Sequence, residues 1–350
     1  MAASRILSVL CVVGTLGVVG TLTQGSWAAS STELPRTMRA AAIDRGGDSK
    51  ELTLHSLPVP QIGAHEVLIA VQVAGVATWD VSIRRHPTEI EHSGFPLVLG
   101  TDGAGTVAAV GPQVHDLKIG DSVYAYSWDN PKGGFYAEYV AVPAERVSRV
   151  PKGLALSDAG AIGTTALTAI QGVDDALHLK AGQTVIIHGA SGGVGTLAIQ
   201  FAKLRGARVL ATASGDDGMS LVKRMGADAV VDSRNGDILL AAHQFAPHGI
   251  DAVLALAGGD GLERCIDALG PGGKVAYPRG VVPPKSRAGL SPIAYDAIPG
   301  PKEFGRLNQA IGQVRLQVPI AAEYPLAEAN KAQERVEAGH ILGKVILRIR

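Results

Sequence analysis

After the first 37 residues, short runs of alternating hydrophobic and polar residues follow one another as far as about Val150. Alternation with a period of two is typical of strands that bury one face. Breaks such as Gly111-Pro112 and Gly120-Asp121 separate the runs. The pattern predicts an irregular, barrel-like β domain. Its strands are expected at Ala40–Ile43, Val67–Val73, Gly105–Val110, Ser122–Tyr126 and Tyr136–Val142.

From about Leu156 to Pro301 the pattern changes, and apolar strand-like runs alternate with segments of helical periodicity. This alternation predicts β-α-β units that form a parallel sheet with right-handed crossovers. The strands are expected at Thr184–His188, Arg208–Thr212, Ala229–Val231, Ile250–Leu256 and Lys274–Tyr277. The remaining residues predict a helix at Leu326–Ala338 and a final strand at Lys344–Arg348.

A glycine-rich loop, Gly189-Ala190-Ser191-Gly192-Gly193-Val194-Gly195, follows the strand Thr184–His188 directly. Helical periodicity begins at Val194, so the loop places backbone N–H groups and a helix N-terminus at one point, which favours a dinucleotide diphosphate. Gly192 is expected to let the backbone approach the phosphates, and Gly195 to let the helix pack on the strand. Ala190 replaces the first glycine of the usual G-x-G-x-x-G pattern.

The first 28 residues have the pattern of a targeting segment. Arg5 precedes the apolar stretch Ile6–Leu22, and Ser26-Trp27-Ala28 offers small residues for a signal peptidase, with cleavage expected before Ala29. This predicts export by a Sec-type signal. The alternatives are an uncleaved anchor that holds the rest of the chain in the cytoplasm, and a misassigned start codon.

Charge and cysteine content narrow the function classes further. The chain has 350 residues and a formal net charge of zero, which argues against nucleic acid as the main partner. A membrane contact is expected only through the N-terminal segment, if it is not cleaved. The two cysteines, Cys11 and Cys265, offer neither a disulfide framework nor a cysteine-rich zinc site. Cys265 is expected to be a buried, inert thiol.

Several motifs in a fixed order resemble the medium-chain dehydrogenase/reductase superfamily, and within it the zinc-independent quinone oxidoreductase (zeta-crystallin-like) branch. They are Phe95–Gly105, Gly134–Val140, Gly163–Ala169, the glycine-rich loop and the closing Glu337–Val345. The resemblance implies an α/β fold: a GroES-like β-barrel catalytic domain over 38–155, completed by 315–350, and a doubly wound Rossmann domain over 156–314. It places the active site in the cleft between them.

Zinc is not expected, although distant relatives in the superfamily are zinc enzymes. Those relatives place a cysteine soon after the strand that ends at Val76, and a histidine and a glutamate in the motif that reads here Gly100-Thr101-Asp102; this chain has Ala77-Thr78 and Thr101 at those places. Without thiolate and imidazole, these positions cannot assemble a catalytic zinc site. His86 and His92 are interpreted as solvated loop residues.

The resemblance also implies where substrate and cofactor bind. Trp79, Asp80 and Thr165 are the candidates for the catalytic cleft, and the alternative role of Asp80 is the N-cap of a short helix at Val81–Arg85. The cofactor-binding candidates are Ala190, Ser191, Gly192, Gly193, Val194, Gly195, Ser214, Thr165, Ala257, Gly258, Pro278 and Arg279. No metal ligand is assigned.

The choice of cofactor depends on the end of the second strand of the parallel sheet, where an NAD enzyme would place Asp or Glu. This chain has Ala213-Ser214-Gly215, which leaves room for a 2′-phosphate and favours NADPH over NADH. Two observations oppose this choice: Gly218 replaces a lysine common in relatives, and Asp216-Asp217 adds negative charge. Lys223 and Arg224 are interpreted as surface cations.

The main functional hypothesis is a zinc-independent NAD(P)H-dependent reductase of quinones or α,β-unsaturated carbonyls. One alternative is an enoyl-thioester reductase, which would need a basic entrance from Arg84, Arg85, Lys285 and Arg287. The other is a non-catalytic nucleotide-binding redox sensor. Relatives commonly pair through an edge strand, so a homodimer is expected through the strand Lys274–Tyr277 and the run that follows it.

Overall fold

A computed structural model of the chain describes residues 34–90 and 94–350. Residues 35–350 form one compact unit. The proposed targeting segment and His92 lie outside the described residues.

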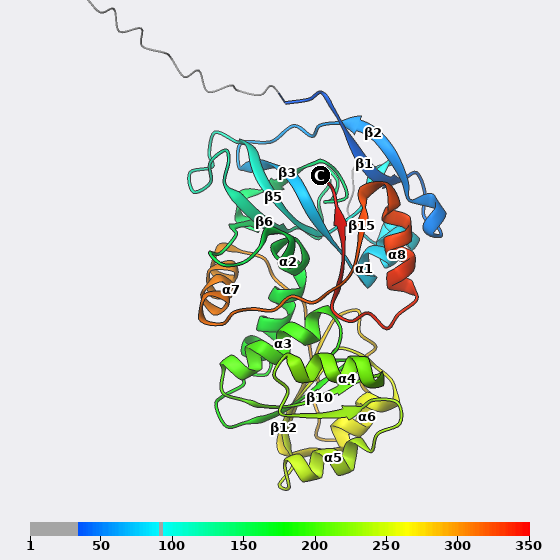
Figure 1. The fold of residues 1–350 in the computed structure, drawn as a ribbon, viewed down its shortest axis with the longest axis vertical. Helices are drawn as coiled ribbons and strands as arrows, with labels where there is room; N and C mark the ends of the chain where they lie inside the picture. The colour runs from blue at the N-terminus through cyan, green and yellow to red at the C-terminus, as the bar shows by residue number, and fades with distance from the viewer. Residues whose placement is uncertain (1–33, 91–93) are drawn as a thin grey trace, which may run out of the picture. The chain divides into compact units, whose positions relative to one another are not determined.

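The first part of the chain forms two mainly antiparallel sheets, and two strands from the end of the chain, drawn in orange to red in Figure 1, complete the larger one. A three-stranded sheet has the order β2-β1-β4, and a larger sheet has the order β15-β16-β3-β5-β6-β8, with β7 also paired to β3. The first sheet contains β1 (Thr37–Ile43), β2 (Thr53–Pro58) and β4 (Leu97–Val98). The second contains β3 (Glu66–Val76), β5 (Asp102–Val110), β6 (Ser122–Tyr126), β7 (Tyr139–Pro143), β8 (Val147–Arg149), β15 (Ile320–Pro325) and β16 (Lys344–Arg348).

The sequence pattern placed the start of one strand of this region too early. β7 starts at Tyr139, whereas the alternation had predicted a strand from Tyr136. The backbone N–H groups of Gly134, Phe135 and Tyr136 donate to the carbonyls of Val98, Gly100 and Leu99. Ala137, just before β7, instead forms an isolated antiparallel bridge with Ala40 of β1, and the ladder with β3 begins only where the N–H of Val71 donates to the carbonyl of Glu138.

The second half of the chain forms a six-stranded sheet in the order β11-β10-β9-β12-β13-β14, and all of its pairs are parallel. This is the Rossmann strand order. The strands are β9 (Thr184–His188), β10 (Arg208–Ala213), β11 (Ala229–Asp232), β12 (Ile250–Ala255), β13 (Leu269–Pro278) and β14 (Ile293–Tyr295). The helices between them are α3 (Gly193–Leu204), α4 (Gly215–Arg224), α5 (Ile238–Phe245) and α6 (Asp260–Asp267).

Helices cover both faces of this sheet, as Figure 1 shows. Val185 and Ile187 of β9 belong to the core that contains α3, whereas Ile186 belongs to a second core with Cys265 of α6. Burial on both faces explains why these strands are continuous apolar runs. The predicted doubly wound parallel sheet is confirmed, and Cys265 is buried as expected, with burial raising the pKa of its thiol to about 12.

The sheet edge differs from the prediction. β14 pairs with β13, so β13 is an inner strand and β14 is the edge. β14 has only three residues and lies in a proline-rich loop, and a run this short gives no recognisable periodicity.

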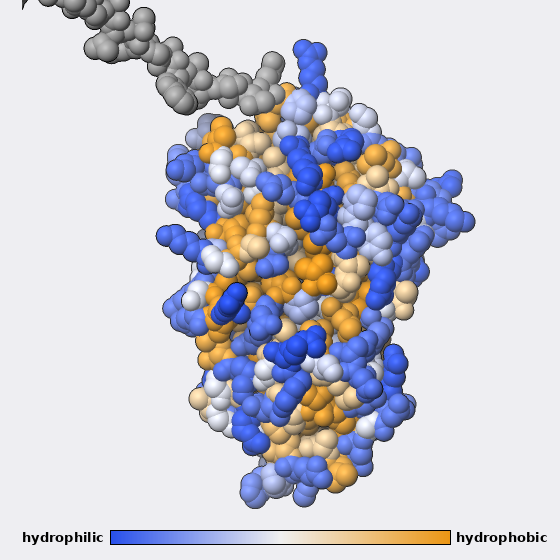
Figure 2. All heavy atoms as spheres, in the orientation of Figure 1, coloured by the Kyte–Doolittle hydropathy of each residue, from blue (hydrophilic) through white to orange (hydrophobic). Residues whose placement is uncertain are grey.

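Helix α2 (Leu156–Gln171) packs against β3, β5 and β6 and also against α3. Two glycines permit this packing: a Cβ on Gly160 would lie 2.6 Å from the side chain of Val73, and one on Gly163 would lie 2.6 Å from the carbonyl oxygen of Ala125. In Figure 2 hydrophobic residues are concentrated across the middle of the face shown, at the height of α2.

The remaining elements are α1 (Thr78–Arg85), α7 (Pro301–Gln313), α8 (Ala329–Glu337), a π-helical turn at Gly172–Ala176, and short 3₁₀ turns at Ser49–Glu51, Pro87–Glu89, Ala144–Arg146 and Leu326–Glu328. The last turn and α8 together make up the helix predicted at Leu326–Ala338. No helix in the described ranges 34–90 and 94–350 is long and apolar enough to span a membrane.

Candidate active site

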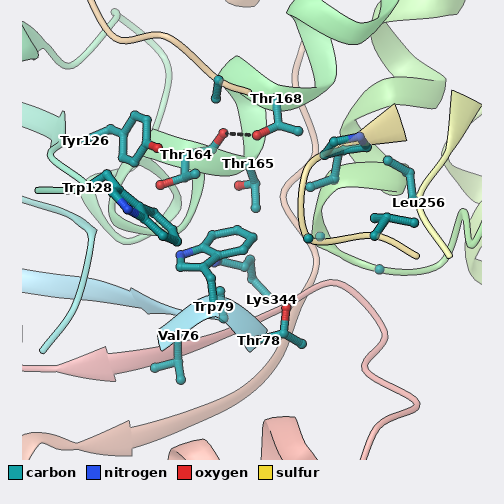
Figure 3. A pocket seen from close by; sticks show the side chains of 18 of the residues that line it. Val76, Thr78, Trp79, Tyr126, Trp128, Thr164, Thr165, Thr168, Leu256 and Lys344 are labelled. Atoms are coloured by element: carbon teal, nitrogen blue, oxygen red, sulfur yellow. Dashed lines mark hydrogen bonds between the residues drawn. The ribbon is translucent and has the colours of Figure 1, made fainter. Parts of the chain in front are cut away.

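A cleft of about 900 Å³ lies where the carboxyl ends of β9 and β12 face α2, α1 and β16. β9 and β12 flank the point where the strand order of the parallel sheet reverses, which is where ligands bind in such sheets. Figure 3 shows Thr164, Thr165 and Thr168 of α2 along the cleft, with Trp79, Tyr126 and Trp128 beside them and Leu256 on the opposite side. The part of the wall shown is aromatic and apolar with a few hydroxyl groups, and charged side chains also line the cleft: Glu89, Asp129, Arg146, Arg279, Asp296 and Lys344.

The glycine-rich loop forms one end of this cleft. Gly192 is the N-cap of α3 and has ordinary extended backbone angles. A Cβ at Gly192 would meet only the carbonyl oxygen of Gly189, 3.8 Å away, so the position is open. By contrast, a Cβ at Gly195 would lie 2.5 Å from the carbonyl oxygen of the buried Ala190. Gly195 therefore permits close packing of α3 on the loop, and Gly192 leaves space where a diphosphate would sit.

The last strand holds this loop in place. The backbone N–H of Gly343 donates to the carbonyl oxygen of Ser191 at 2.8 Å. Next along the chain, the side chain of Lys344 passes 3.1 Å from where a Cβ of Gly193 would be. Lys344 is only 4% exposed and lines the cleft, and its Nζ has no hydrogen-bond partner among the described residues. It lies 5.2 Å from the centre of the Trp79 ring. No pattern in the sequence pointed to this buried ammonium group.

The positions of the zinc ligands in distant relatives do not form a metal site. Thr101 Oγ1 accepts a hydrogen bond of 2.7 Å from Trp79 Nε1, and Ala77 offers no ligand atom. One oxygen of Asp102 accepts from the backbone N–H of Thr164 at 2.8 Å. In the described part of the chain, no three His, Cys, Asp or Glu side chains cluster as a metal site would require.

Asp80 is fully buried and does not line the cleft. Its Oδ2 accepts from the backbone N–H of Ala77 at 2.8 Å and from the hydroxyl of Tyr136 at 3.2 Å. Burial raises the pKa of Asp80 to about 7, against an opposing effect of Lys344. Asp80 is not the N-cap of this helix. α1 begins at Thr78, so Asp80 is its third residue, and its carboxylate accepts from the N–H of Ala77, the residue before the helix.

The two neighbouring threonines of α2 differ in what their hydroxyls do. Thr165, the residue selected from the sequence, lines the cleft, but its hydroxyl donates to the carbonyl oxygen of Ala161 at 2.9 Å. Thr164 also lines the cleft, and its buried Oγ1 has no hydrogen-bond partner among the described residues. Thr164 is therefore the better hydrogen-bonding candidate, and only the structure distinguishes the two.

The other cofactor candidates divide into two groups. The cleft is lined by Gly192, Gly193, Val194, Gly195, Pro278 and Arg279. Ala190, Ser191, Ser214, Ala257 and Gly258 lie outside this lining. A Cβ on Gly189 would lie 3.1 Å from the Cβ of Ala257, so Ala257 packs close to the glycine-rich loop. Ser214 Oγ lies 3.2 Å from Nδ1 of His340, a residue that was not selected from the sequence.

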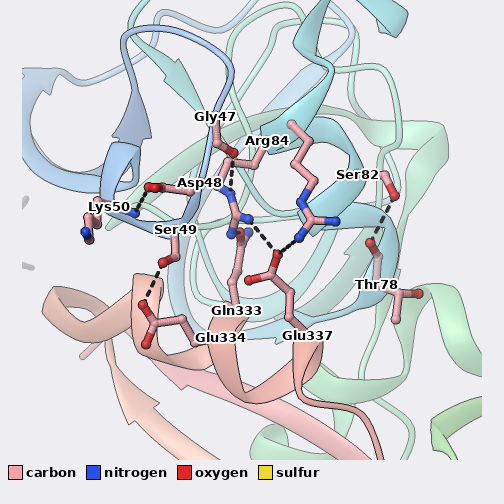
Figure 4. A network of polar contacts seen from close by, with 11 residues as sticks. Gly47, Asp48, Ser49, Lys50, Thr78, Ser82, Arg84, Gln333, Glu334 and Glu337 are labelled. Atoms are coloured by element: carbon pink, nitrogen blue, oxygen red, sulfur yellow. Dashed lines mark hydrogen bonds and ion pairs between the residues drawn. The ribbon is translucent and has the colours of Figure 1, made fainter.

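The four cations considered for a basic entrance are all paired. Figure 4 shows Arg84, which is fully buried and donates to Gln333 Oε1 at 2.6 Å and to Glu337 Oε1 at 2.8 Å. Arg85 also pairs with Glu337. Lys285 pairs with Asp260, and Arg287 with Glu263 and Asp267. None of these four cations lines the cleft.

Comparison with known proteins agrees with this geometry. Residues 63–152 match the model of the alcohol dehydrogenase GroES-like domain, and residues 193–287 match that of the zinc-binding dehydrogenase family. The chain is 30% identical over 328 residues to a quinone oxidoreductase of Pongo abelii, covering 89% of this chain and 98% of that protein. The chain belongs to the quinone oxidoreductase branch of the medium-chain dehydrogenase/reductase superfamily.

Two further relatives are named for different nicotinamide cofactors. The chain is 29% identical to the chloroplastic NADPH-dependent alkenal/one oxidoreductase of Arabidopsis thaliana, covering 91% of this chain and 81% of that protein. A solved NAD-dependent alcohol dehydrogenase superposes with a TM-score of 0.81 at 28% identity, covering 89% of this chain and all of the other. Relatives therefore include proteins named for either cofactor, so the cofactor preference of this oxidoreductase has to come from its own residues.

Proposed function

We propose that this oxidoreductase is a zinc-independent, NADPH-dependent reductase of quinones or α,β-unsaturated carbonyls. The observation that carries the proposal is the combination of an open glycine-rich loop with an adjoining aromatic cleft that has Ala77 and Thr101 at the positions of zinc ligands. Membership of the quinone oxidoreductase branch supports the same function.

The residues around the cleft fit the nicotinamide group, which supplies a hydride when bound. Trp79, Tyr126 and Trp128 provide flat apolar surfaces for a planar acceptor. The unpartnered hydroxyl of Thr164 offers a donor to a carbonyl oxygen or amide at the cleft wall. Water can protonate the oxygens of a reduced quinone, so no side chain in the described lining has to deliver a proton.

NADPH is the proposed cofactor because Ser214, at the N-cap of α4, presents a hydroxyl where NAD enzymes place an acidic side chain. Asp217 lies one turn later, but its carboxylate is engaged by His340 at 3.0 Å and by the N–H of Gly218 at 2.8 Å. The negative charge that opposed this choice in the sequence is therefore partly compensated.

A panel of acceptors tests the function. We expect oxidation of NADPH with quinones and enones, and little reduction of simple aldehydes, which need stronger polarisation of the carbonyl. Thr164→Val should lower kcat roughly 10-fold or more, whereas Thr165→Val should have a smaller effect because that hydroxyl is bonded within its helix. Efficient aldehyde reduction without activity on quinones or enones would contradict the proposal.

We further propose a homodimer through the edge strand β14. Ile293 in this strand and Ile298 just after it are 37% and 64% exposed, and an uncovered edge favours pairing with a second chain. Light scattering at micromolar concentration should give twice the chain mass; a monomer alone would contradict it.

For residues 1–28 we propose a cleaved Sec-type signal, with a membrane anchor as the alternative. The apolar stretch and the small residues before Ala29 support this interpretation. N-terminal sequencing combined with protease protection of intact cells distinguishes the two. A start at Ala29 outside the cytoplasmic membrane supports export, and an intact, protected chain contradicts it.

A further inference from the structure

Two polar side chains from the start of α4, Ser214 and Asp217, meet His340 from the far end of the chain at the carboxyl end of β10. His340 Nδ1 lies 3.2 Å from Ser214 Oγ, and His340 Nε2 lies 3.0 Å from Asp217 Oδ2. His340 belongs to the turn after α8, and positive φ angles at Gly339 and His340, 71° and 49°, turn the chain there. Its side chain remains 35% exposed and is thus accessible to a ligand.

The position of this cluster suggests what it contacts. In Rossmann folds the end of the second strand recognises the 2′ position of the adenosine ribose. Gly218 lies between the cluster and the glycine-rich loop: a Cβ there would be 3.6 Å from the side chain of Ser191. His340 therefore lies beside the part of the site that distinguishes NADPH from NADH.

The hydrogen bonds imply a different behaviour for each protonation state of His340. Asp217 is held ionised, since the hydrogen bond from His340 lowers the pKa of its carboxyl. An ionised carboxylate can only accept, so neutral His340 must carry its proton on Nε2, and its bare Nδ1 then accepts from the Ser214 hydroxyl. Protonation adds an N–H at Nδ1, which releases the Ser214 hydroxyl to donate elsewhere.

We propose that His340 recognises the 2′ position of the cofactor and makes the preference for NADPH dependent on pH. Protonated His340 and Ser214 offer two donors and a positive charge to a 2′-phosphate. Neutral His340 offers an acceptor to the ribose 2′-hydroxyl of NADH. This proposal rests on the nicotinamide cofactor of the proposed function.

The other charged groups around His340 do not take over its role in the pH dependence. Asp217 faces the imidazole directly, and Asp216 precedes it on α4. From α8, the guanidinium of Arg335 donates to the carbonyl oxygens of Gly339 and His340 at 2.8 and 3.1 Å. Arg335 is thus committed to the turn.

The test measures Kd for NADPH and NADH on the full-length protein by titration from about pH 5.5 to about pH 8.5. The ratio of NADPH to NADH affinity should fall roughly 10-fold or more as the pH rises through this range. In His340→Gln this fall should be lost. Because the 2′-phosphate itself titrates near pH 6, the comparison is between variants at the same pH. His243→Gln, an exposed histidine on α5, is the matched control and should behave as the wild type.

A gain-of-function variant provides a second test. Gly218→Lys in the His340→Gln background adds a permanent cation at a position where a Cβ makes only ordinary contacts, the nearest at 3.4 Å. It should restore NADPH preference at all pH values. Equal pH dependence in the wild type and His340→Gln would overturn the inference while leaving the proposed function intact. A wild-type chain that binds neither cofactor at any pH would overturn both.

Discussion

Replacing Gly192 by Asp should separate cofactor binding from folding. Gly192 has φ −77° and ψ 175°, angles that any residue adopts, and a Cβ at this position would have no atom within 4 Å except the carbonyl oxygen of Gly189. As the N-cap of α3, an Asp should stabilise the helix by a few tenths of a kcal/mol relative to Gly. The free energy of unfolding should therefore stay the same or rise slightly.

The effect on the cofactor has the opposite sign. Two unit charges about 5 Å apart at an effective dielectric constant of about 20 interact with roughly 3 kcal/mol. Repulsion between the new carboxylate and the diphosphate should thus weaken NADPH binding at least about 100-fold. Gly192→Asn has the same shape and also caps helices, so the difference between the two variants isolates the charge.

The assay is a fluorescence titration with NADPH beside a denaturant unfolding curve. Gly195→Ala is the contrasting variant: its Cβ would lie 2.5 Å from a backbone oxygen, so it should destabilise the fold by about 1–3 kcal/mol. Unchanged NADPH affinity in well-folded Gly192→Asp would refute the placement of the diphosphate at this loop.

Further predictions concern metal content, the core and pH. Elemental analysis should find no stoichiometric zinc and chelators should not change activity, because Ala77 and Thr101 offer no zinc ligand set; one zinc per chain would contradict this. Arg84→Ala should lower the free energy of unfolding by about 3–5 kcal/mol, because Arg84 is fully buried. Arg85 is exposed, so Arg85→Ala should lower it by at most about 1 kcal/mol. Equal effects of the two variants would be inconsistent with the network of Figure 4. The pKa of Asp80 rises from 3.8 to about 7 on folding, so the folded state holds an extra proton and stability should fall as the pH rises between these values. Asp80→Asn should lose that part of the pH dependence, and an identical pH slope in both proteins would show that Asp80 is not its source.

Local signals predicted much of the fold. The strands Ser122–Tyr126, Thr184–His188 and Lys344–Arg348 have the predicted bounds, since each is an apolar or alternating run between turn residues. Helix α2 offers no such signal: it is buried from Ala159 to Gln171, so it lacks the polar face that makes a helix recognisable.

The family resemblance pointed to Trp79, Thr165, Pro278 and Arg279, which line the cleft, but the residues alone made the site predictable only where it is local in sequence. The glycine-rich loop is one contiguous segment, and its function follows from its own residues. Lys344 and His340 reach the cofactor region from the far end of the chain, 151 residues after Gly193 and 126 residues after Ser214. Such a juxtaposition depends on the return of β16 to β3, which neither composition nor periodicity encodes.

Single-turnover oxidation of NADPH tests the central claim most directly. The protein, stripped of metal with a chelator, is loaded with one equivalent of NADPH and mixed with excess quinone or enone, and the loss of the reduced nicotinamide absorbance is followed. We predict complete oxidation at a rate that does not change when zinc is added or removed. Bound NADPH that persists with every quinone and enone, or that is oxidised only after zinc is added, would contradict a zinc-independent hydride transfer in this cleft.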